Sequence, residues 1–328
     1  MTEPVLPAEA FAALERELLG GERLHTRADV ERLAGVDEEA ARRLWRALGF
    51  ADVDEDNVAF TDRDVDALRT VTSLVRMGIV EERTQLAVTR AMGQSLSRLA
   101  EWQVATITDV LAHNDQLGPD EATEAARVLV PVMENLIGYV WRRHLAATAG
   151  RVLTSGQGDA DVRHMTVGFA DLVGFTTLTR QVDEAELERV VDTFEALATD
   201  VIAEAGGRVV KTVGDEVMFT VDDPQVAAEI ALRIAENAAA ADGVPDVRVG
   251  VAYGSALARL GDVYGEPVNL ASRLTSVARP GTVLVDRELA TILEADARWR
   301  LRRLPPRPVR GYTLLQAYRL RRAGDDGD

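Results

Sequence analysis

The chain has 328 residues, of which 47% are hydrophobic and 28% charged, proportions that are typical of soluble globular proteins and exclude disorder along the whole chain. Its formal charge of −17 argues against a protein that works mainly on nucleic acid or on an anionic membrane surface, since both attract Lys and Arg. The lack of cysteine excludes disulfides and thiolate-bound zinc. A chain of this length is expected to form two domains, because single cores usually stop growing at about 250 to 300 residues.

The N-terminal stretch MTEPVLPAEA lacks the basic and apolar regions of a signal peptide. The most apolar run, residues 128–141, is interrupted by Pro131, Glu134 and Asn135. It falls short of the roughly 20 apolar residues that cross a bilayer. We therefore expect a cytoplasmic protein without a membrane span.

Residues 1–150 predict an all-helical domain, which we interpret as regulatory. Thr61 to Asp64 is a capping box, the usual start of a helix, and the helix that it predicts carries Val65 and Leu68 on one face. Other apolar residues recur with the three- and four-residue spacing of helix faces. These are Leu14 and Leu18; Val30 and Leu33; Leu44, Trp45 and Leu48; Met92, Leu96 and Leu99; and Leu129, Met133, Leu136 and Val140.

Residues 26–77 also resemble a helix-turn-helix reader of DNA, because a short turn joins two expected helices. The second helix carries Arg42, Arg43 and Arg46. The acidic residues around it would repel phosphates, which favours an interaction or regulatory domain over DNA binding. Those acids are Asp37, Glu38, Glu39, Asp52, Asp54, Glu55 and Asp56.

Residues 151–163, which include LTSGQGDAD, are small and polar and predict a linker to a second domain, residues 164–328. There, strand and helix patterns alternate: a strand at 164–172, a helix ending at Gly206-Gly207, a helix at 224–241 and a strand at 247–254. Between them, RVVKTVGDEVMFTV predicts a hairpin with Gly214-Asp215 at its tip. The order predicts an α+β fold, a mixed sheet covered by helices in the ferredoxin-like manner.

Two aspartates of this domain are candidate metal ligands. Asp171 ends the strand of the sequence VGFADLVGFT among apolar residues, and Asp215 lies at the hairpin tip. Purely structural roles are the alternatives: Asp171 would cap the next turn or helix, and Asp215 would only favour the tight turn. If the strand and the hairpin bring both acids together, without a Cys or His cluster, they form an oxygen-only site that suits Mg²⁺ or Mn²⁺.

Two further segments suit phosphate chemistry. The turn at Phe175 and Thr176 follows Asp171, and free backbone N–H groups in such a turn can receive phosphate oxygens. Asn269 and Arg273 lie four residues apart on one face of an expected helix. As a pair they suit the anionic oxygens of a phosphoryl transition state, although a cap and a surface ion pair would explain each residue alone.

Residues 165–294 resemble the catalytic domain of class III nucleotidyl cyclases. The resemblance is carried by FADLVGFT, KTVGDEVM and GDVYGEPVNLASR, which follow one another in the order of that family. The first half of the chain only resembles the soluble helical regulatory domains that precede some bacterial cyclases, through RAMGQSLSRLAEWQV.

The resemblance implies a complete set of site residues. Asp171 and Asp215 match the two aspartates that bind two divalent metal ions, and Asn269 and Arg273 match the transition-state residues. Lys211 and Asp262 match the pair that recognises adenine. Lys211 would donate to a ring acceptor and Asp262 would accept from the exocyclic amine, whereas guanine presents the opposite pattern. The implied activity is conversion of ATP to 3′,5′-cyclic AMP.

The resemblance also implies a homodimer whose active sites are shared between chains, so that Lys211 and Asp215 of one chain would serve different sites. Guanylate cyclase and a non-catalytic nucleotide-sensing or transcriptional module remain as alternatives. A small molecule or a lipid is a possible effector of the helical domain. A weaker hypothesis assigns proton sensing to His144 and His164, on either side of the linker, but ordinary surface histidines explain both.

Overall fold

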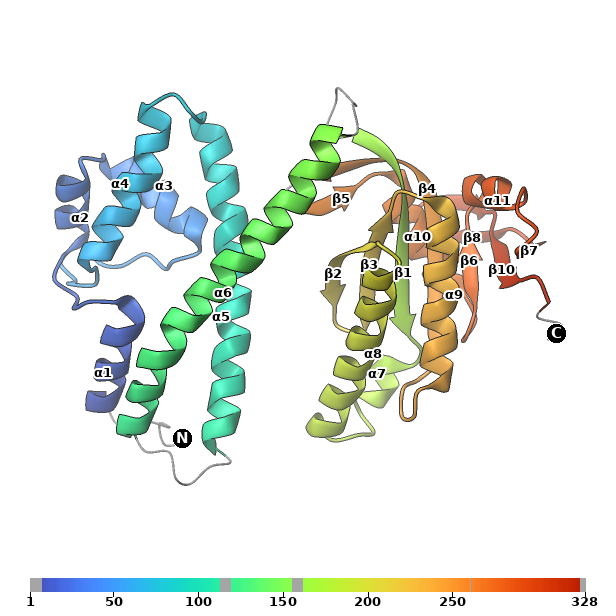
Figure 1. Ribbon diagram of the computed structural model, residues 1–328, viewed down its shortest axis with the longest axis horizontal. Coiled ribbons are helices and arrows are strands. Elements are labelled where there is room, and N and C mark those ends of the chain that lie inside the picture. The colour runs from blue at the N-terminus through green and yellow to red at the C-terminus, as the bar shows by residue number, and fades with distance from the viewer. Residues whose placement is uncertain (1–7, 113–118, 155–161, 260, 325–328) are drawn as a thin grey trace. The chain divides into compact units, whose positions relative to one another are not determined.

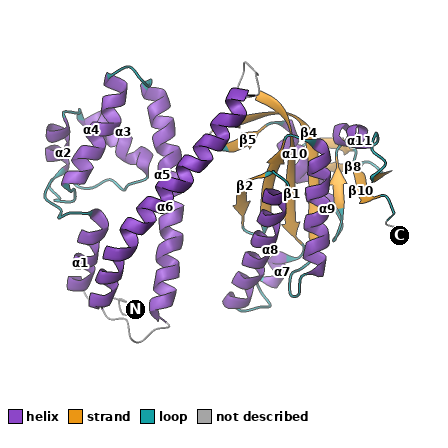
Figure 2. Ribbon diagram, in the orientation of Figure 1, coloured by secondary structure: helices purple, strands orange, loops and turns teal. Residues whose placement is uncertain are grey.

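The computed structural model describes residues 8–112, 119–154, 162–259 and 261–324. It divides into two compact units, Met1–Gly156 and Gln157–Asp328. The described part of the first unit consists of helices apart from an isolated β-bridge, and the second combines helices with strands (Figures 1 and 2). The predicted α+β class, with a helical region before the sheet, is therefore confirmed.

The first unit is built around a core of short helices. Val30, Leu44, Trp45, Val65 and Leu68 are buried in this core. The helix that begins after Thr61 has the predicted capping box, formed with Asp64. The helices are α1 (Ala8–Leu19), α2 (Arg27–Ala34), α3 (Glu38–Leu48), α4 (Asp62–Arg76), α5 (Glu82–Ala112) and α6 (Pro119–Thr154).

The two long helices, α5 and α6, leave much of their apolar surface exposed. The predicted apolar faces fall on these helices, but Met92 and Leu96 on α5 and Leu129, Leu136 and Val140 on α6 are all exposed. The core of this unit, which is formed around α2, α3 and α4, therefore does not cover them. Within the described residues, no helix combines enough length and apolarity to cross a membrane.

The second unit contains a long mixed sheet. Its strands are β1 (Val162–Leu172), β2 (Arg208–Val213), β3 (Glu216–Val221), β4 (Val247–Arg259), β5 (Asp262–Tyr264), β6 (Val283–Val285), β7 (Trp299–Arg303), β8 (Arg307–Val309), β9 (Tyr312–Leu315) and β10 (Tyr318–Arg322). Its helices are α7 (Phe175–Leu178), α8 (Glu184–Glu204), α9 (Pro224–Ala240), α10 (Glu266–Val277) and α11 (Arg287–Leu293).

The strand order is β2-β3-β1-β4-β6-β10-β7, with β5 paired to β4 and a separate β8–β9 pair. The first four strands of this order form the antiparallel arrangement of ferredoxin-like folds, as predicted. Helices α8 and α9 pack on one face of the sheet, where Phe194 and Ile230 are fully buried. Helix α10 packs on the other face through Ala271 and Leu274 (Figure 1).

A glycine turn joins two neighbouring strands of the sheet. Gly214 has φ +62°, a left-handed conformation that glycine adopts at little cost, so the chain turns directly from β2 into β3 as the hairpin prediction requires.

The expected linker, residues 151–163, overlaps two elements of the structure. Helix α6 runs to Thr154, and strand β1 begins at Val162. Residues 155–161 lie outside the described part of the chain.

Helix α10 approaches β4 closely because Gly250 has no side chain. A Cβ atom at this position would collide with the backbone nitrogen of Thr275 and the carbonyl oxygen of Ala271, both on α10. Neither atom can move without moving the helix. Gly250 therefore fixes the distance between the sheet and the helix that carries Asn269 and Arg273.

We predict that Gly250→Ala lowers the free energy of unfolding by about 1–3 kcal/mol, the usual cost of overpacking a core. It should also lower any activity that depends on α10. Gly138→Ala on α6 is the control, because an added Cβ there meets no atom within 4 Å. Chemical denaturation followed by circular dichroism measures the difference, and equal stability of both variants would contradict the close-packing argument.

Candidate functional site

The two candidate metal aspartates meet at one end of β1. Asp171 is the next-to-last residue of β1, and Asp215 lies in the turn between β2 and β3. The backbone N–H of Leu172 donates to the carbonyl oxygen of Asp215 at 3.2 Å, which ties this turn to the strand end. The structure therefore brings together two acids that are 44 positions apart in the sequence.

A third carboxylate belongs to the same cluster. Glu216 is directly opposite Asp171 in the β1–β3 pairing. Burial, and then the charges of Asp171 and Asp215, raise the pKa of Glu216 to about 7. Burial and the neighbouring Asp171 also raise the pKa of Asp215. Negative charge is therefore crowded here beyond what the surrounding protein compensates.

Arg248 is the cation of this cluster. It is paired with Asp171 across the β1–β4 ladder, and its guanidinium forms an ion pair with the Asp171 carboxylate. The side chain of Asp171 is only 15% exposed and that of Arg248 28%, so the pair is partly shielded from water. The Nε atom of Arg248 is buried and has no hydrogen-bond partner among the described residues.

These observations argue against the interpretation of Asp171 as the cap of the following helix. The N-cap position of α7 is Gly174, so Asp171 does not cap the helix that follows it. Its partner is instead a cation within a group of carboxylates.

The donor set fits a hard divalent cation. Carboxylate oxygens are the ligands that Mg²⁺ and Mn²⁺ prefer, and a cation would relieve the crowding that raises the pKa of Asp215 and Glu216. Among the described residues, no group of three or more His, Cys, Asp or Glu side chains forms a full ligand set. Asp171 and Asp215 would therefore hold a metal with water or substrate oxygens as the other ligands, as is common for Mg²⁺.

Lys211 and Asp262, predicted as a base-recognition pair, also meet. Lys211 is on β2 and Asp262 begins β5, and the Lys211 Nζ donates to Asp262 Oδ2 at 2.7 Å. Burial alone would raise the pKa of Asp262, but the hydrogen bonds from Lys211 and the Val263 N–H hold it below its ordinary value. The two side chains thus satisfy each other, with both still partly exposed.

Asn269 and Arg273 lie on α10, one turn apart, as predicted. The N-cap of this helix is Gly265, so Asn269 does not cap it. Within the described residues, no carboxylate lies within ion-pair distance of Arg273, so the surface ion pair does not form either. No hydrogen bond in this part of the chain joins Asn269 or Arg273 to the aspartate cluster or to Lys211.

Phe175 and Thr176 form the start of the short helix α7. Phe175 packs against the core under α8 and α9, whereas Thr176 is exposed. The segment follows Asp171 directly, so it begins beside the carboxylate cluster. The first backbone N–H groups of any helix lack an intrahelical acceptor, so the phosphate-facing turn stays a prediction.

Sequence reasoning missed Arg248 and Glu216. Both follow from strand register, because each lies directly opposite Asp171 on a neighbouring strand. A signal for Glu216 was present, since it follows Asp215 within KTVGDEVM. Arg248 is an arginine in the otherwise apolar start of the strand VRVGVAYG, and a charge there suggests a partner.

Comparison with known proteins identifies the family of this chain. The model for the adenylate and guanylate cyclase catalytic domain matches residues 159–322. An adenylate cyclase of Streptomyces coelicolor is 42% identical over 98% of this chain and 93% of its own length. An adenylate cyclase of Glutamicibacter nicotianae is 38% identical over 97% of this chain and 83% of its own length.

Among solved structures, the adenylyl cyclase of P. aeruginosa is 23% identical, covering 51% of this chain and 98% of its own, with a TM-score of 0.43. The chain belongs to the family of adenylate and guanylate cyclases, as the resemblance predicted.

We predict that Arg248→Gln lowers the stability of the metal-free protein by about 1–3 kcal/mol, because it leaves the Asp171 carboxylate without its cation. Added Mn²⁺ should restore more stability to this variant than to the wild type. Thermal unfolding with EDTA and then with Mn²⁺ measures both effects.

Arg233→Gln is the control, since Arg233 pairs with Glu204 away from the cluster. If Mn²⁺ raised the unfolding temperature of both variants equally, Arg248 would have no special relation to a metal site.

Proposed function

We propose that the protein is an adenylate cyclase that converts ATP to 3′,5′-cyclic AMP and pyrophosphate with two divalent metal ions. The observation that carries the proposal is the meeting of Asp171 and Asp215, with Glu216, at the end of β1. The relatives that align with almost the whole chain are named adenylate cyclases, which supports ATP as the substrate.

In this proposal each group has one task. Asp171 and Asp215 would hold the metal ions, which when bound would supply Lewis-acid activation of the ribose 3′-hydroxyl and neutralise charge on the triphosphate and the leaving group. With Asp171 engaged as a metal ligand, the guanidinium of Arg248 would be available to phosphate oxygens, and the unpartnered Nε atom of Arg248 supports this role.

Base selection is assigned to Lys211 and Asp262. A cationic donor and an anionic acceptor that already face each other match the ring acceptor and exocyclic donor of adenine. Guanine would leave both side chains mispaired, which costs binding free energy. Asn269 would orient the ribose and Arg273 would stabilise charge on the α-phosphoryl oxygens, and the lack of an ion-pair partner for Arg273 in the described residues supports that role.

We infer that the active protein is a homodimer with shared sites. Asn269 and Arg273 make no described hydrogen bond to the aspartate cluster of their own chain. A second copy that contributes these two residues would complete each site, and twofold symmetry would give two equivalent sites.

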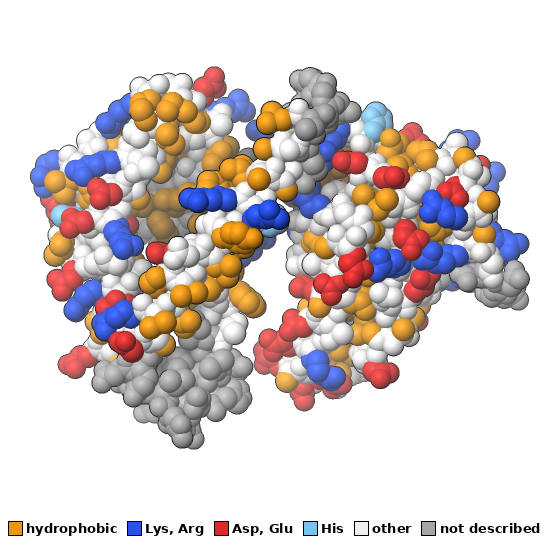
Figure 3. All heavy atoms as spheres, viewed as in Figure 1, with side chains coloured by type: hydrophobic (Ala, Val, Ile, Leu, Met, Phe, Trp, Pro, Cys, Tyr) orange, Lys and Arg blue, Asp and Glu red, His pale blue; other side chains and the backbone are white. Residues whose placement is uncertain are grey.

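The apolar surface of the first unit is consistent with association. Hydrophobic side chains gather along α6 in Figure 3, and Val128, Val132, Tyr139, Trp141 and Leu145 on this helix are each more than half exposed. Such a surface is unusual on a monomer, so we assign it to a second copy of the chain. Pairing of the first units would give them a means to regulate the catalytic units, because a site at an interface responds to small rigid-body shifts.

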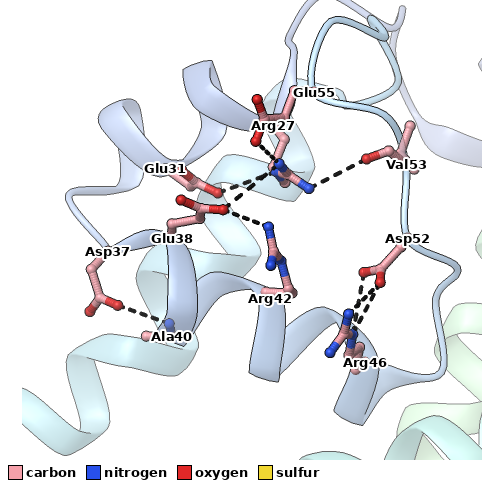
Figure 4. A network of polar contacts seen from close by, with 10 residues as sticks. All are labelled: Arg27, Glu31, Asp37, Glu38, Ala40, Arg42, Arg46, Asp52, Val53 and Glu55. Carbon is pink, nitrogen blue, oxygen red and sulfur yellow. Dashed lines mark hydrogen bonds and ion pairs between the residues drawn. The ribbon is translucent and has the colours of Figure 1, made fainter.

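The alternative of a DNA-binding module is weakened by the ion pairs of α3. Arg42 pairs with Glu38 at 2.5 Å and Arg46 with Asp52 at 2.5 Å (Figure 4). Arg43 is shared between Glu39 and Glu82, each at 2.8 Å. The arginines that suggested a DNA-reading helix are therefore already neutralised by carboxylates.

We predict that the purified chain forms cyclic AMP from ATP only with Mg²⁺ or Mn²⁺, and that Asp171→Ala lowers the rate by at least about two orders of magnitude. GTP should react much more slowly than ATP, and Asp262→Asn should reduce the ratio of the ATP rate to the GTP rate. Separation of the nucleotide products measures the rates. Metal-dependent binding of ATP without turnover would instead favour the nucleotide-sensing alternative.

The same assay on residues 157–328 tests regulation by the first unit. A rate that differs from that of the full chain supports a regulatory role, and identical rates and metal dependence argue against it.

We predict that mixing inactive Asp171→Ala chains with inactive Arg273→Ala chains restores activity. In a mixed dimer with shared sites, one site carries both substitutions and the other carries neither. Chain exchange is verified with two affinity tags. Exchange without recovery would refute the shared site, and two copies of Asp171→Ala with different tags control for the mixing itself.

A further inference from the structure

Two basic side chains of β2 contact the start of the short strand β5 and the residue before it. The Lys211 Nζ donates to Asp262 Oδ2 at 2.7 Å, and the Arg208 Nη1 donates to the carbonyl oxygen of Gly261 at 3.3 Å. Gly261 directly precedes Asp262, so two neighbouring residues accept hydrogen bonds from one strand. Lys211 has a proposed role in base selection, whereas Arg208 has none.

An irregularity of β2 explains how both side chains reach the same place. In a regular strand, residues three positions apart point to opposite faces of the sheet. Val209 lies opposite Phe219 in the β2–β3 pairing, and the next pair along the two strands is Lys211 with Met218. Val210 is therefore an extra residue on β2. Such a β-bulge shifts the alternation by one position and so re-aims the side chains that follow it.

The buried residues of β3 show which face the two cations occupy. Phe219 belongs to the core beneath α8 and α9, whereas Met218 belongs to the core beneath α10. Residues that lie opposite each other share a face, so Lys211 is on the α10 face with Met218. Arg208 is on this face as well, because its partner Thr220 is two residues from Met218. The bulge thus places both cations on one face of the sheet.

Both cations also act on the charge state of Asp262. Burial would raise the pKa of Asp262, but the hydrogen bonds from Lys211 and the Val263 N–H, and then the charges of Lys211 and Arg208, lower it below its ordinary value. An ionised carboxylate only accepts hydrogen bonds, whereas a protonated one also donates. Protonated Asp262 would therefore be able to donate to the carbonyl oxygen of guanine.

Arg208 differs from Lys211 in what holds it. A base bound between Lys211 and Asp262 would engage the Lys211 ammonium and leave the Asp262 carboxylate with one cation fewer. The acceptor of Arg208 is instead the backbone carbonyl of Gly261, so this contact can persist while a base is bound. Strand β5 has only three residues, and β4 is its strand partner in the described part of the chain, so a side chain that fixes its start matters for the position of Asp262.

We propose that Arg208 is a positioning residue for base selection, which holds Asp262 in place as a hydrogen-bond acceptor and so favours adenine over guanine. Arg208 acts through Gly261 and Asp262 and does not itself contact the base. This inference rests on the base selection proposed for Lys211 and Asp262. It adds the β-bulge at Val210 as the feature of the sequence that brings Arg208 to this site.

The test compares nucleotide binding by Arg208→Gln and Arg163→Gln in the full chain. Gln removes the charge and the reach of the guanidinium. Arg163 on β1 is the control, because it pairs with Asp222 at 3.5 Å and has no contact with the β5 segment among the described hydrogen bonds. The ligands are 3′-deoxy-ATP and 3′-deoxy-GTP with Mn²⁺, which lack the attacking hydroxyl and cannot cyclise. Calorimetry measures the dissociation constant of each.

We expect Arg208→Gln to lower the ratio of the 3′-deoxy-GTP to the 3′-deoxy-ATP dissociation constant about tenfold, the effect of one charge-assisted hydrogen bond. Arg163→Gln should leave this ratio unchanged. Arg208→Lys should keep most of it, since Lys retains the charge and a donor. An unchanged ratio in Arg208→Gln would overturn the inference. So would an equal loss of affinity for both nucleotides, because that result would show a merely structural role.

Asp262→Asn separates a failure of this inference from a failure of the base selection on which it rests. If Asp262→Asn lowers the ratio and Arg208→Gln does not, the role of Arg208 is wrong and the base-selecting pair stands. If Asp262→Asn leaves the ratio unchanged, or if the wild type binds neither nucleotide, the pair and the role of Arg208 are both wrong.

Discussion

The central constraint on the second unit is electrostatic. Its fold places several carboxylates together where strand β1 ends, and bringing these negative charges together costs free energy. Asp171 is fixed by β1, Asp215 by the turn after β2, and Glu216 by its register with Asp171. Each sits in partly buried surroundings where ionised oxygen is costly, and Arg248 offsets only part of that cost. Strand pairing therefore concentrates unfavourable electrostatic free energy at one point, and the cations that we propose to bind there would offset it.

The surrounding fold holds this cluster rigidly. Apolar side chains on both faces of the sheet form two cores, one beneath α8 and α9 and one beneath α10. A central sheet buried on both sides leaves little freedom for the register of its strands, because a one-residue slip would turn every side chain to the other face. The close contact at Gly250 extends the same constraint to α10.

Much of this organisation could be predicted from local pattern. The Gly214-Asp215 turn, the helical stretches and the α+β class follow from glycine placement and from the alternation of apolar residues, which are properties of neighbours in sequence. The Lys211–Asp262 pair was predicted through resemblance. Arg248 could not be, because its contact with Asp171 depends on which residues of two distant strands face each other. The same holds for the exposed apolar stripes of α5 and α6, since periodicity shows that a helix has an apolar face but not what covers it.

The contact between Lys211 and Asp262 has a consequence for the base selection that we propose for this pair. Each of the two side chains is already the hydrogen-bond partner of the other. A base that binds between them would have to exchange with an existing partner, so the free energy gained from the correct base would be a small difference between two similar sets of contacts. The wrong base would have to separate the same pair without forming equivalent contacts. A site of this kind would discriminate between purines while holding its substrate loosely enough to turn it over.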